Sequence, residues 1–481
     1  MKTSLIILIL LLFTFIATAQ WQPDVRLTNN SCFSYIFENT SIAVNENAVH
    51  VVWWDDRTGN NEIFYKYSSD GGINWSDDIQ LTTDNGDSWG PSIAVSDSTT
   101  HVVWRENRDG NFEIYYKHSL YGGWGNDVRL TDDPSELESI DPAIAVSGQN
   151  VHVVWADRRN TGGYEIYYKN SQNLGLNWSG DIRLTHTNNS GIAQQPSIAV
   201  SDSTVNICWL YYDVTANSYE LYYTISNNGG LSWADSIRLV YGGKSDHPAI
   251  AAKNSNVVLV WRDKRDVNYE IYFKSSDDYG VTWSEDIRLT TAGGDSWQPA
   301  IAIWESLVHV VWQDNRTGDF EIYYKRSTDG GQNWDPDTRL TNKNADSDKP
   351  SIALSESVVH LVWQDFRDGN REIYYKQNPT GNVVGINDFN FSIPESHELH
   401  QNFPNPFNPS TSIQYAISSR QFVSLKVYDI LGNEIATLVN EEQPAGRYEV
   451  EFNAATLPSG VYFYQLKAGE YTAVKKMILL K

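Results

Sequence analysis

The chain repeats one pattern seven times, and the length of this repeat constrains its fold more than any other feature. In each period a tryptophan ends a β-branched run and a segment Glu-(Ile/Leu)-Tyr-(Tyr/Phe) follows, with an acid-x-Arg turn between them in six of the seven. The tryptophans lie 51 to 54 residues apart and are Trp53, Trp104, Trp155, Trp209, Trp261, Trp312 and Trp363. A period of this length, made of short strands, is one small sheet that must stack on its neighbours to bury its faces.

Four strands can be read within one period. In the second repeat they are 91–95, 101–104, 113–117 and 127–131, separated by Gly-, Asn- and Asp-rich turns. A copy of the last strand also stands at 24–28, whereas the seventh repeat ends after 372–376 without one. We therefore predict an all-β fold in which residues 20–376 form a seven-bladed β-propeller, closed by the N-terminal strand beside 372–376.

The N-terminus and the charge indicate where the protein works. Residues 1–19 combine an early lysine, an apolar run and a small-residue Ala-Thr-Ala end, which is typical of a secretory signal peptide. No later stretch approaches the roughly 20 apolar residues of a membrane span. A net charge of −24 argues against nucleic acid and anionic membranes as partners, since both select for basic patches. We expect a secreted or cell-surface protein whose partners are extracellular glycans or proteins.

The period stops after residue 376, and a different segment follows. Residues 377–397 read as a linker, and 398–481 contain alternating strands typical of a small β-sandwich at 411–417, 423–428, 446–452 and 461–467. The motifs Leu-His-Gln-Asn-Phe-Pro-Asn-Pro-Phe-Asn-Pro-Ser-Thr, Val-Tyr-Asp-Ile-Leu-Gly and Leu-Pro-Ser-Gly-Val-Tyr-Phe-Tyr resemble the type A C-terminal sorting domain of the type IX secretion system. The resemblance implies passage through a bacterial outer membrane by that machinery, commonly with removal of this domain and release or surface attachment.

The turns between third and fourth strands carry a second resemblance. Three of them read Ser-x-Asp-x-Gly-x-x-Trp and resemble the Asp-box, or bacterial neuraminidase repeat, of sialidase-like propellers. Their residues are Ser68, Asp70, Gly72, Trp75; Ser276, Asp278, Gly280, Trp283; and Ser327, Asp329, Gly331, Trp334. Two more copies carry Asn173 and Asn228 in place of the Asp. Because either side chain can accept the backbone N–H groups of a tight turn, we predict a structural role.

The acid-x-Arg turns are expected on the opposite face, around the central channel. Four of their arginines are candidates for an anionic ligand, because guanidinium groups bind carboxylates bidentately: Arg57, Arg108, Arg265 and Arg316. In the fourth repeat, however, acid, Arg and the following strand's Lys change together to Tyr211, Asp213 and Thr224. This joint change favours a charge network within each blade over a ligand site.

The segments that precede each first strand are less alike. Trp89 with Asp87, and Trp297 with Asp295, stand in two of these segments, where the other repeats have no tryptophan. An aromatic ring next to polar groups is a common sugar-binding arrangement. The two rings could equally cover the top of a blade, and the sequence leaves both interpretations open.

The resemblance to sialidases implies a six-bladed ring, an arginine triad, a Tyr–Glu nucleophile pair and an Asp acid/base. This chain has seven periods and lacks the family's Arg-Ile-Pro signature, and only the fourth repeat offers unique titratable groups, Tyr211, Tyr212 and Asp213. No side chains have metal-ligand spacing, so neither metal nor cofactor is expected. The favoured function is non-catalytic glycan or surface binding. A sialidase-like exo-glycoside hydrolase and a protein-interaction scaffold are the alternatives.

Overall fold

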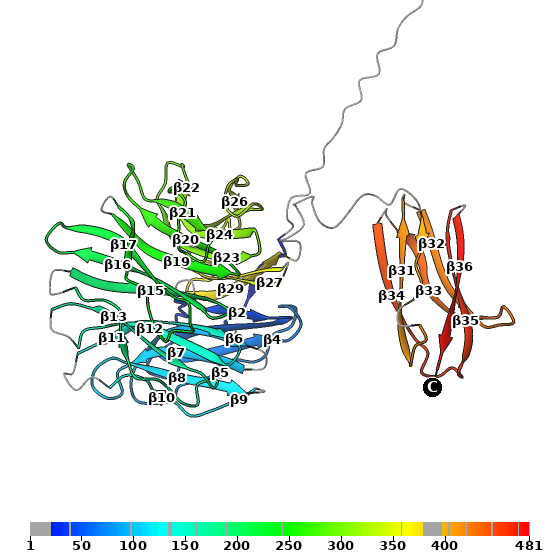
Figure 1. The fold of residues 1–481 in the computed structure, drawn as a ribbon, viewed down its shortest axis with the longest axis horizontal. Coiled ribbons are helices and arrows are strands. Elements are labelled where there is room, and N and C mark those ends of the chain that lie inside the picture. Colours follow the sequence, from blue (N-terminus) through cyan, green and yellow to red (C-terminus); the bar gives the residue numbers. More distant parts are fainter. Residues whose placement is uncertain are drawn as a thin grey trace, which may run out of the picture. The chain divides into compact units, whose positions relative to one another are not determined.

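The computed structural model describes residues 21–378 and 397–480, apart from 38–39, 97–98, 121, 133–136, 160–161, 188–190, 242–243, 357, 403–404, 419–420, 444–445 and 470. The predicted signal peptide and most of the predicted linker lie outside the described residues. The chain divides into two compact units, Met1–Val384 and Gly385–Lys481 (Figure 1). Every described element is a β-strand.

The described part of the first unit contains seven antiparallel sheets, which we number in chain order. Six run in sequence order from the first strand to the last, and the seventh has the order β1-β29-β28-β27. Sheet one contains β2 (Ile42–Asn45), β3 (Ala48–Asp55), β4 (Glu62–Ser68) and β5 (Ile79–Gln80); sheet two contains β6 (Ser88–Ser96), β7 (Thr99–Glu106), β8 (Glu113–Leu120), β9 (Gly123–Trp124) and β10 (Val128–Arg129). Sheet three contains β11 (Ser139–Ser147), β12 (Asn150–Asp157), β13 (Glu165–Ser171) and β14 (Ile182–Arg183); sheet four contains β15 (Gly191–Ser201), β16 (Thr204–Asp213), β17 (Ser218–Ser226) and β18 (Ile237–Val240). Sheet five contains β19 (Ser245–Lys253), β20 (Asn256–Asp263), β21 (Glu270–Ser276) and β22 (Ile287–Arg288); sheet six contains β23 (Ser296–Trp304), β24 (Leu307–Thr317), β25 (Asp319–Ser327) and β26 (Thr338–Arg339); sheet seven contains β27 (Ser347–Ser355), β28 (Val358–Asp365), β29 (Glu372–Asn378) and β1 (Val25–Arg26).

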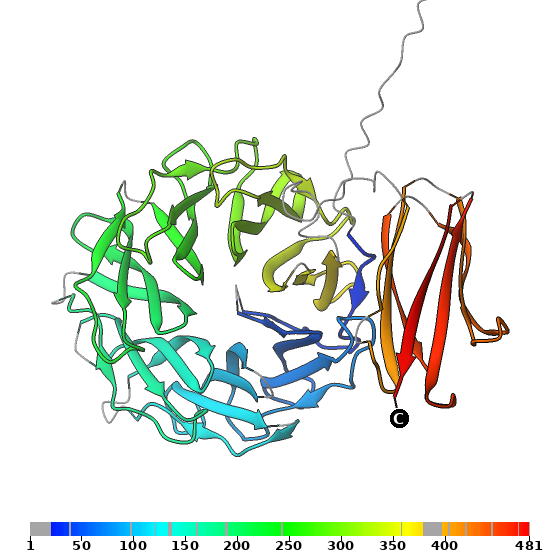
Figure 2. The same ribbon diagram turned by 45° about the vertical axis from the view of Figure 1, so that its right-hand side comes forward.

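The seven sheets are arranged around a centre (Figure 2). The first strand of each sheet contacts the first strand of the next, and β2 contacts β27, so the cycle of contacts is closed. The repeated tryptophans are buried on the second strands, where they fill the space between neighbouring sheets. Trp261, for example, shares a core with Leu221 and Tyr223 of the preceding sheet. Large aromatic side chains at this position supply the apolar area that holds the sheets together.

The N-terminal segment completes sheet seven, as the sequence predicts. Val25 pairs with Tyr375 and Arg26 pairs with Tyr374. The Arg26 guanidinium also bonds Glu372 at 2.7 Å. Strand β29 continues to Asn378, two residues beyond the predicted end of the repeat region, because its pairing with β28 extends that far.

Outside sheet one, the first strands begin earlier than the sequence indicates. Trp89 and Trp297, predicted to lie in connecting segments, are part of β6 and β23 and pair with Arg105 and Gln313. A register shift separates this pairing from the rest of the strand. Five of the six residues before the strand prolines are not glycine, yet have φ between 50° and 53°: Asp141, Gln195, His247, Gln298 and Lys349. Positive φ in front of a proline, which cannot donate to the ladder, produces the bulge.

Histidine–tyrosine pairs cross from the second to the third strand in five sheets, and the histidine is buried in four of them and half-buried in sheet one. The Nδ1-to-hydroxyl distances are 2.6 to 2.7 Å for His50–Tyr65, His101–Tyr116, His152–Tyr168, His309–Tyr324 and His360–Tyr375. Burial lowers the pKa of His50, His152 and His360 to about 4 and of His101 and His309 to about 3. Sheet four has Asn206 bonded to Tyr223 instead, and sheet five has Val258 and Phe273. Sheet four therefore keeps the tyrosine and changes only the histidine, whereas sheet five changes both residues.

The second unit contains two sheets in its described part. One has the order β30-β31-β34 and the other β33-β32-β35-β36. Their strands are β30 (Glu398–Leu399), β31 (Ser410–Ile417), β32 (Gln421–Tyr428), β33 (Glu434–Gln443), β34 (Gly446–Asn453), β35 (Gly460–Ala468) and β36 (Tyr471–Leu479). Both sheets contribute to one apolar core, for example through Tyr415 from the first and Leu425 and Tyr464 from the second.

Candidate functional site

The Asp-box turns bond chiefly within themselves. The Ser68 hydroxyl accepts the N–H of Gly72 and donates to the Asp70 carboxylate, both at 2.8 Å. That carboxylate accepts the N–H of Asn74 at 2.8 Å, and this bond is the main cause that lowers the pKa of Asp70 to about 2. The copies at 276–283 and 327–334 repeat these bonds, and Asn173 and Asn228 accept the equivalent N–H at 2.9 Å.

Each Asp-box also contacts the preceding sheet. Trp75 meets Tyr375 of sheet seven edge-on, with 4.9 Å between ring centroids. Gly72 has φ 89°, and a Cβ at this position would overlap the Tyr375 ring. Glycine is therefore needed twice, for its backbone conformation and for the close approach. The turn joins one sheet to its neighbour.

The acid-x-Arg turns form charge networks inside their sheets. In sheet one the Trp53 indole N–H donates to Asp55 at 3.0 Å, and Arg57 binds the same carboxylate at 2.8 and 2.5 Å. Arg57 also bonds Asp78 at 2.6 Å, and Lys66 bonds Asp78 at 2.8 Å. The network that the sequence favours is thus present.

The other three candidate arginines are paired in the same way. Arg108 bonds Glu106 and Asp127, Arg265 bonds Asp263 and Asp286, and Arg316 bonds Asp314 and Asp337. Burial alone would lower the pKa of Arg316, but the hydrogen bonds and charges of Asp314 and Asp337 raise it above its ordinary value. These guanidinium groups are already neutralised by carboxylates of the protein.

The two candidate tryptophans are half-buried and pack against other side chains. The Arg262 guanidinium lies 4.6 Å from the Trp297 ring centroid, and the Phe320 ring lies 5.7 Å away. Trp89 has Arg105 at 5.3 Å and Phe112 at 5.6 Å. These contacts support the interpretation in which the rings cover the top of a sheet.

Asp87 and Asp295 fasten the backbone beside these tryptophans. Asp295 accepts the Tyr269 N–H at 2.9 Å, and its own N–H donates to Asn315 at 2.8 Å. Asp87 accepts the Asn61 N–H at 3.0 Å, and its N–H donates to Asn107 at 2.7 Å. In both cases the aspartate links the end of one sheet to the next.

Sheet four differs from the others and borders a groove of about 630 Å³. Tyr211 and Asp213 line it, whereas Tyr212 lies on the other face of the strand, where it stacks on Tyr219 at 4.6 Å and donates to Asn217. Successive residues of a strand face opposite sides, so the three predicted catalytic candidates do not form one site. The groove is lined by Leu184, Thr185, His186, Thr187, Trp209, Tyr211, Asp213, Glu220, Tyr222, Ala234, Asp235, Ser236 and Arg238.

Glu220 is a groove residue that the sequence interpretation did not select. In five other sheets a threonine hydroxyl donates to the equivalent glutamate: Thr28, Thr82, Thr131, Thr185 and Thr290. In sheet four this position is Val240, and Arg238 bonds Glu220 at 2.5 Å. The exchange of threonine for valine is the sequence signal that could have identified this glutamate.

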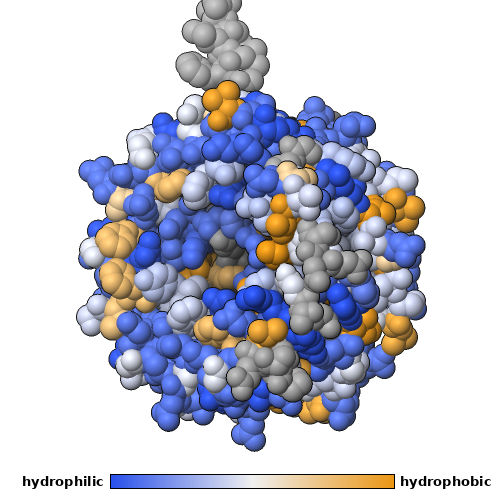
Figure 3. All heavy atoms as spheres, turned by 90° about the vertical axis from the view of Figure 1, so that its left-hand side faces the viewer, coloured by the Kyte–Doolittle hydropathy of each residue, from blue (hydrophilic) through white to orange (hydrophobic). Residues whose placement is uncertain are grey.

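A smaller cavity of about 120 Å³ lies among the first strands. Asp141, Gln195 and His247 contribute to it from three sheets, and the His247 N–H donates to Gln195 at 3.1 Å. Figure 3 shows a hollow at the centre of one face of the ring, with mainly hydrophilic surroundings. Small-molecule sites typically have about 300 Å³ or more, so the groove at sheet four is the better candidate.

Among the described residues, no three His, Cys, Asp or Glu side chains lie together in a way that could hold a metal ion. In the same part of the chain, no helix has the length and apolar character to cross a membrane.

Comparison with protein families confirms both resemblances noted in the sequence. Residues 105–293 match the BNR repeat-like domain, and residues 401–480 match the secretion system C-terminal sorting domain. A search of curated proteins by sequence finds no match. The sorting domain indicates an exported protein.

Solved structures resemble the chain at low sequence identity. The crystal structure of polysaccharide lyase Uly1 has a TM-score of 0.52 and 10% identity, covering 75% of this chain and 99% of that one. Phage phi92 endosialidase has a TM-score of 0.48 and 12% identity, covering 95% and 87%. A mutant of Trypanosoma rangeli sialidase that displays trans-sialidase activity has a TM-score of 0.43 and 12% identity, covering 81% and 83%. At this identity the likeness to Uly1 supports the fold alone.

Proposed function

We propose that this chain, which carries a BNR repeat-like domain and a secretion system sorting domain, is an exported seven-bladed β-propeller that binds glycans without cleaving them. The closed cycle of seven sheets, with β1 as the outer strand of the last, supports the propeller assignment. The two sheets of the tail share one core, which supports a β-sandwich. The route of export is type IX secretion, with the tail as the segment that the machinery recognises.

The groove of sheet four is the observation that carries the binding function. Tyr211 and Tyr222 bring aromatic rings to it, and Glu220 and Arg238 bring hydrogen-bonding groups. Its volume of about 630 Å³ is in the range of small-molecule sites, typically about 300 to 1,000 Å³. Rings that stack on the apolar face of a sugar, next to groups that bind its hydroxyls, are the chemistry of glycan recognition.

The bonding of the two central carboxylates argues against hydrolysis in this groove. Glycoside hydrolysis by paired carboxyl groups needs one acid and one base or nucleophile facing the same bond. Glu220 is engaged by Arg238, and one oxygen of Asp213 accepts the N–H groups of Thr215 and Ala216 at 2.8 and 2.9 Å. Both carboxylates therefore have bonding partners within the protein.

A glycan array probed with the mature full chain tests the proposal. A binding glycan should be retained by the wild type and lost by Tyr211→Leu, which removes a groove ring. Tyr212→Leu is the matched control, because this neighbouring tyrosine lies on the opposite face of β16. Equal loss in both variants, or no glycan bound at all, would refute the assignment.

An activity assay separates binding from cleavage. The same protein is incubated with fluorogenic sialosides and uronides, and release of the fluorophore is followed. We expect no turnover. Turnover that disappears in Glu220→Gln would support a glycoside hydrolase instead of a non-catalytic binding protein. Binding to cell-envelope protein alone would support the protein-interaction scaffold.

A further inference from the structure

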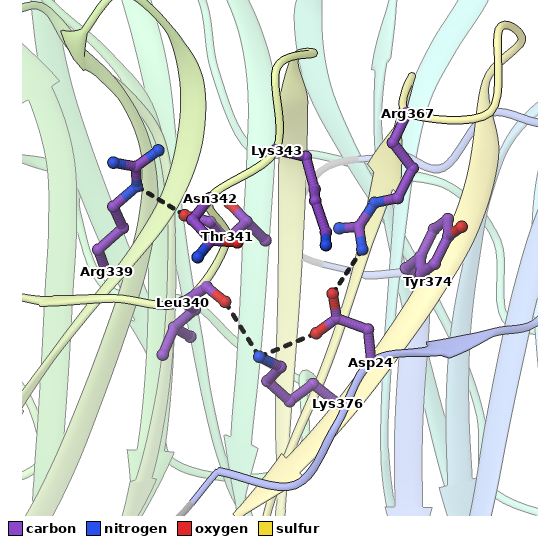
Figure 4. Close-up of a pocket in the computed structure, with 9 residues that line it drawn as sticks. All are labelled: Asp24, Arg339, Leu340, Thr341, Asn342, Lys343, Arg367, Tyr374 and Lys376. Atoms are coloured by element: carbon purple, nitrogen blue, oxygen red, sulfur yellow. Dashed lines mark hydrogen bonds and ion pairs between the residues drawn. The ribbon is translucent and has the colours of Figure 1, made fainter.

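A second groove lies between sheets six and seven and has a volume of about 690 Å³. The ends of Lys343 and Arg367 point toward each other in this groove, next to Asp24 (Figure 4). Lys343 is exposed, and no hydrogen bond or ion pair joins its ammonium group to any described residue. Arg339 lies farther along the same groove and is bonded to Glu321.

The junction between sheets one and two shows how a carboxylate can occupy the equivalent place. There the segment after the fourth strand reads Leu-Thr-Thr-Asp and ends at Asp84, whereas between sheets six and seven it reads Leu-Thr-Asn-Lys and ends at Lys343. Asp84 bonds the Arg108 guanidinium of the next sheet at 2.6 Å. A lysine thus stands where the equivalent junction has a carboxylate.

Arg108 has one carboxylate partner more than Arg367, which has two, as Arg57, Arg265 and Arg316 do. Arg108 bonds Glu106, Asp127 and Asp84. Arg367 bonds only the equivalents of the first two, Asp365 at 2.5 Å and Asp24 at 2.6 Å.

With Lys343 in the position of Asp84, the groove between sheets six and seven has the opposite local charge to the junction between sheets one and two. Around Arg108, two cations (Arg108, Lys117) face three carboxylates (Glu106, Asp127, Asp84), a sum of −1. Around Arg367, three cations (Arg367, Lys376, Lys343) face two carboxylates (Asp365, Asp24), a sum of +1. In a chain with a net charge of −24, a groove with surplus positive charge is set up to attract an anion.

We propose that this groove binds an oxyanion group, a carboxylate or sulfate, between the Lys343 ammonium and the Arg367 guanidinium, in the place that the Asp84 carboxylate takes at the first junction. The groove is far larger than one ion, so the group is carried on an extended molecule such as an acidic polysaccharide. Guanidinium and ammonium groups both recognise such oxygens, the first through paired N–H donors and the second as a point charge. This site does not depend on the groove of sheet four.

Titration calorimetry of the mature full chain with acidic polysaccharides tests the site. The probes are dextran sulfate and polygalacturonate, with dextran as the uncharged control and inorganic sulfate as the free anion. We expect both acidic polymers to bind and dextran not to bind. Lys343→Asp, which restores the arrangement of the first junction, should weaken binding about tenfold or more, and Lys343→Met should weaken it less.

Two variants serve as matched controls. Lys253→Asp makes the same charge change at the end of β19, away from the groove, and should leave binding unchanged. Asp84→Lys recreates the Lys343 arrangement beside Arg108 and should add a second binding site, seen as a higher stoichiometry.

Three outcomes decide the proposal. Equal affinity of wild type and Lys343→Asp, or an equal loss in Lys253→Asp, overturns the site. Inorganic sulfate that binds as tightly as the polymers keeps the site but assigns it to a free anion. Thermal unfolding of each variant identifies any loss of binding that comes from misfolding, and in that case Lys343→Met and Asp84→Lys decide.

Discussion

The indole of Trp21 meets the Tyr324 ring edge-on, with 5.1 Å between ring centroids and 81° between planes. Five other tryptophans contact the tyrosine of the preceding sheet in the same way, and a sixth contacts a phenylalanine: Trp75–Tyr375, Trp124–Tyr65, Trp178–Tyr116, Trp233–Tyr168, Trp283–Tyr223 and Trp334–Phe273. Trp21 is thus the missing member of the set. The N-terminal segment supplies both the fourth strand and the tryptophan of sheet seven.

Trp21→Ala should destabilise the ring. The substitution removes the aromatic contact with sheet six and should lower the free energy of unfolding by about 2 kcal/mol, less than full burial would give because the side chain is half-buried. Thermal and chemical unfolding measure the effect. Trp75→Ala, the equivalent change in sheet one, should cost a similar amount, and a much smaller cost for Trp21 would show that the N-terminal contact is dispensable.

Ser68→Ala should be more damaging than Asp70→Asn. Ser68 is buried and its hydroxyl bonds both Gly72 and Asp70, so its removal should cost about 1 to 2 kcal/mol of stability. Asn173 makes the same turn bond in sheet three, so Asp70→Asn should leave the melting temperature unchanged. Differential scanning calorimetry compares the two variants. The reverse order would mean that the charge of Asp70, and not its geometry, holds the turn.

The buried histidines should make the ring sensitive to acid. Because burial lowers their folded-state pKa to about 3 or 4, the unfolded chain binds protons more readily below about pH 6.5. The stability that the neutral histidines contribute is fully present above about pH 6.5 and is lost as the pH falls toward their folded-state pKa values. Each histidine adds up to about 1.4 kcal/mol per pH unit to the slope of the free energy of unfolding against pH.

Melting temperatures between neutral pH and the folded-state pKa values measure this slope. Sheet five offers a matched variant, because Val258 and Phe273 replace the pair there. The double substitution His50→Val with Tyr65→Phe should therefore make the pH dependence shallower. An unchanged slope would exclude His50 as a source.

Trp297→Ala separates the two interpretations of the tryptophans in β6 and β23. Its contacts with Arg262 and Phe320 indicate a structural role, so we expect a loss of about 2 kcal/mol of stability and no change in glycan affinity. Trp297→Phe keeps an aromatic ring and should retain much of that stability. A variant with a normal melting temperature and weaker glycan binding would instead support sugar stacking.

Much of the fold follows from the repeat itself. The alternation of β-branched and aromatic residues with Gly- and Asp-rich turns predicts the four strands, and the stray copy at 24–28 predicts the pairing of β1 with β29. The Trp-x-Pro-Asp segment that begins at Trp21 matches the one that begins at Trp334, and this match is the sequence signal for the contact of Trp21 with sheet six. The bulge in β23 cannot be predicted locally, because positive φ at an ordinary residue such as Gln298 is imposed by packing and not by local propensity.

The sites were less predictable than the fold. The joint change at Tyr211, Asp213 and Thr224 indicates that sheet four is different, but strand alternation places Tyr212 on the other face from Tyr211 and Asp213. The positions of Lys343 and Arg367 depend on how neighbouring sheets stack, a relationship between distant parts of the sequence that no local pattern records. Aligning the repeats identifies the residues that differ from one sheet to the next, but only the three-dimensional structure shows which of these residues lie close together.

The pairing of β1 with β29 joins residues about 350 positions apart, and this sets the order in which an exported chain can finish folding. A chain that crosses a membrane N-terminus first delivers β1 at the start and β29 near the end. Sheets one to six can form as their own segments arrive, because each is built from consecutive strands. Sheet seven must wait, with the slow kinetics of a long-range contact. Closure of the ring therefore reports that the whole repeat region has been delivered, and a chain stalled in transit keeps an open seam beside sheet one.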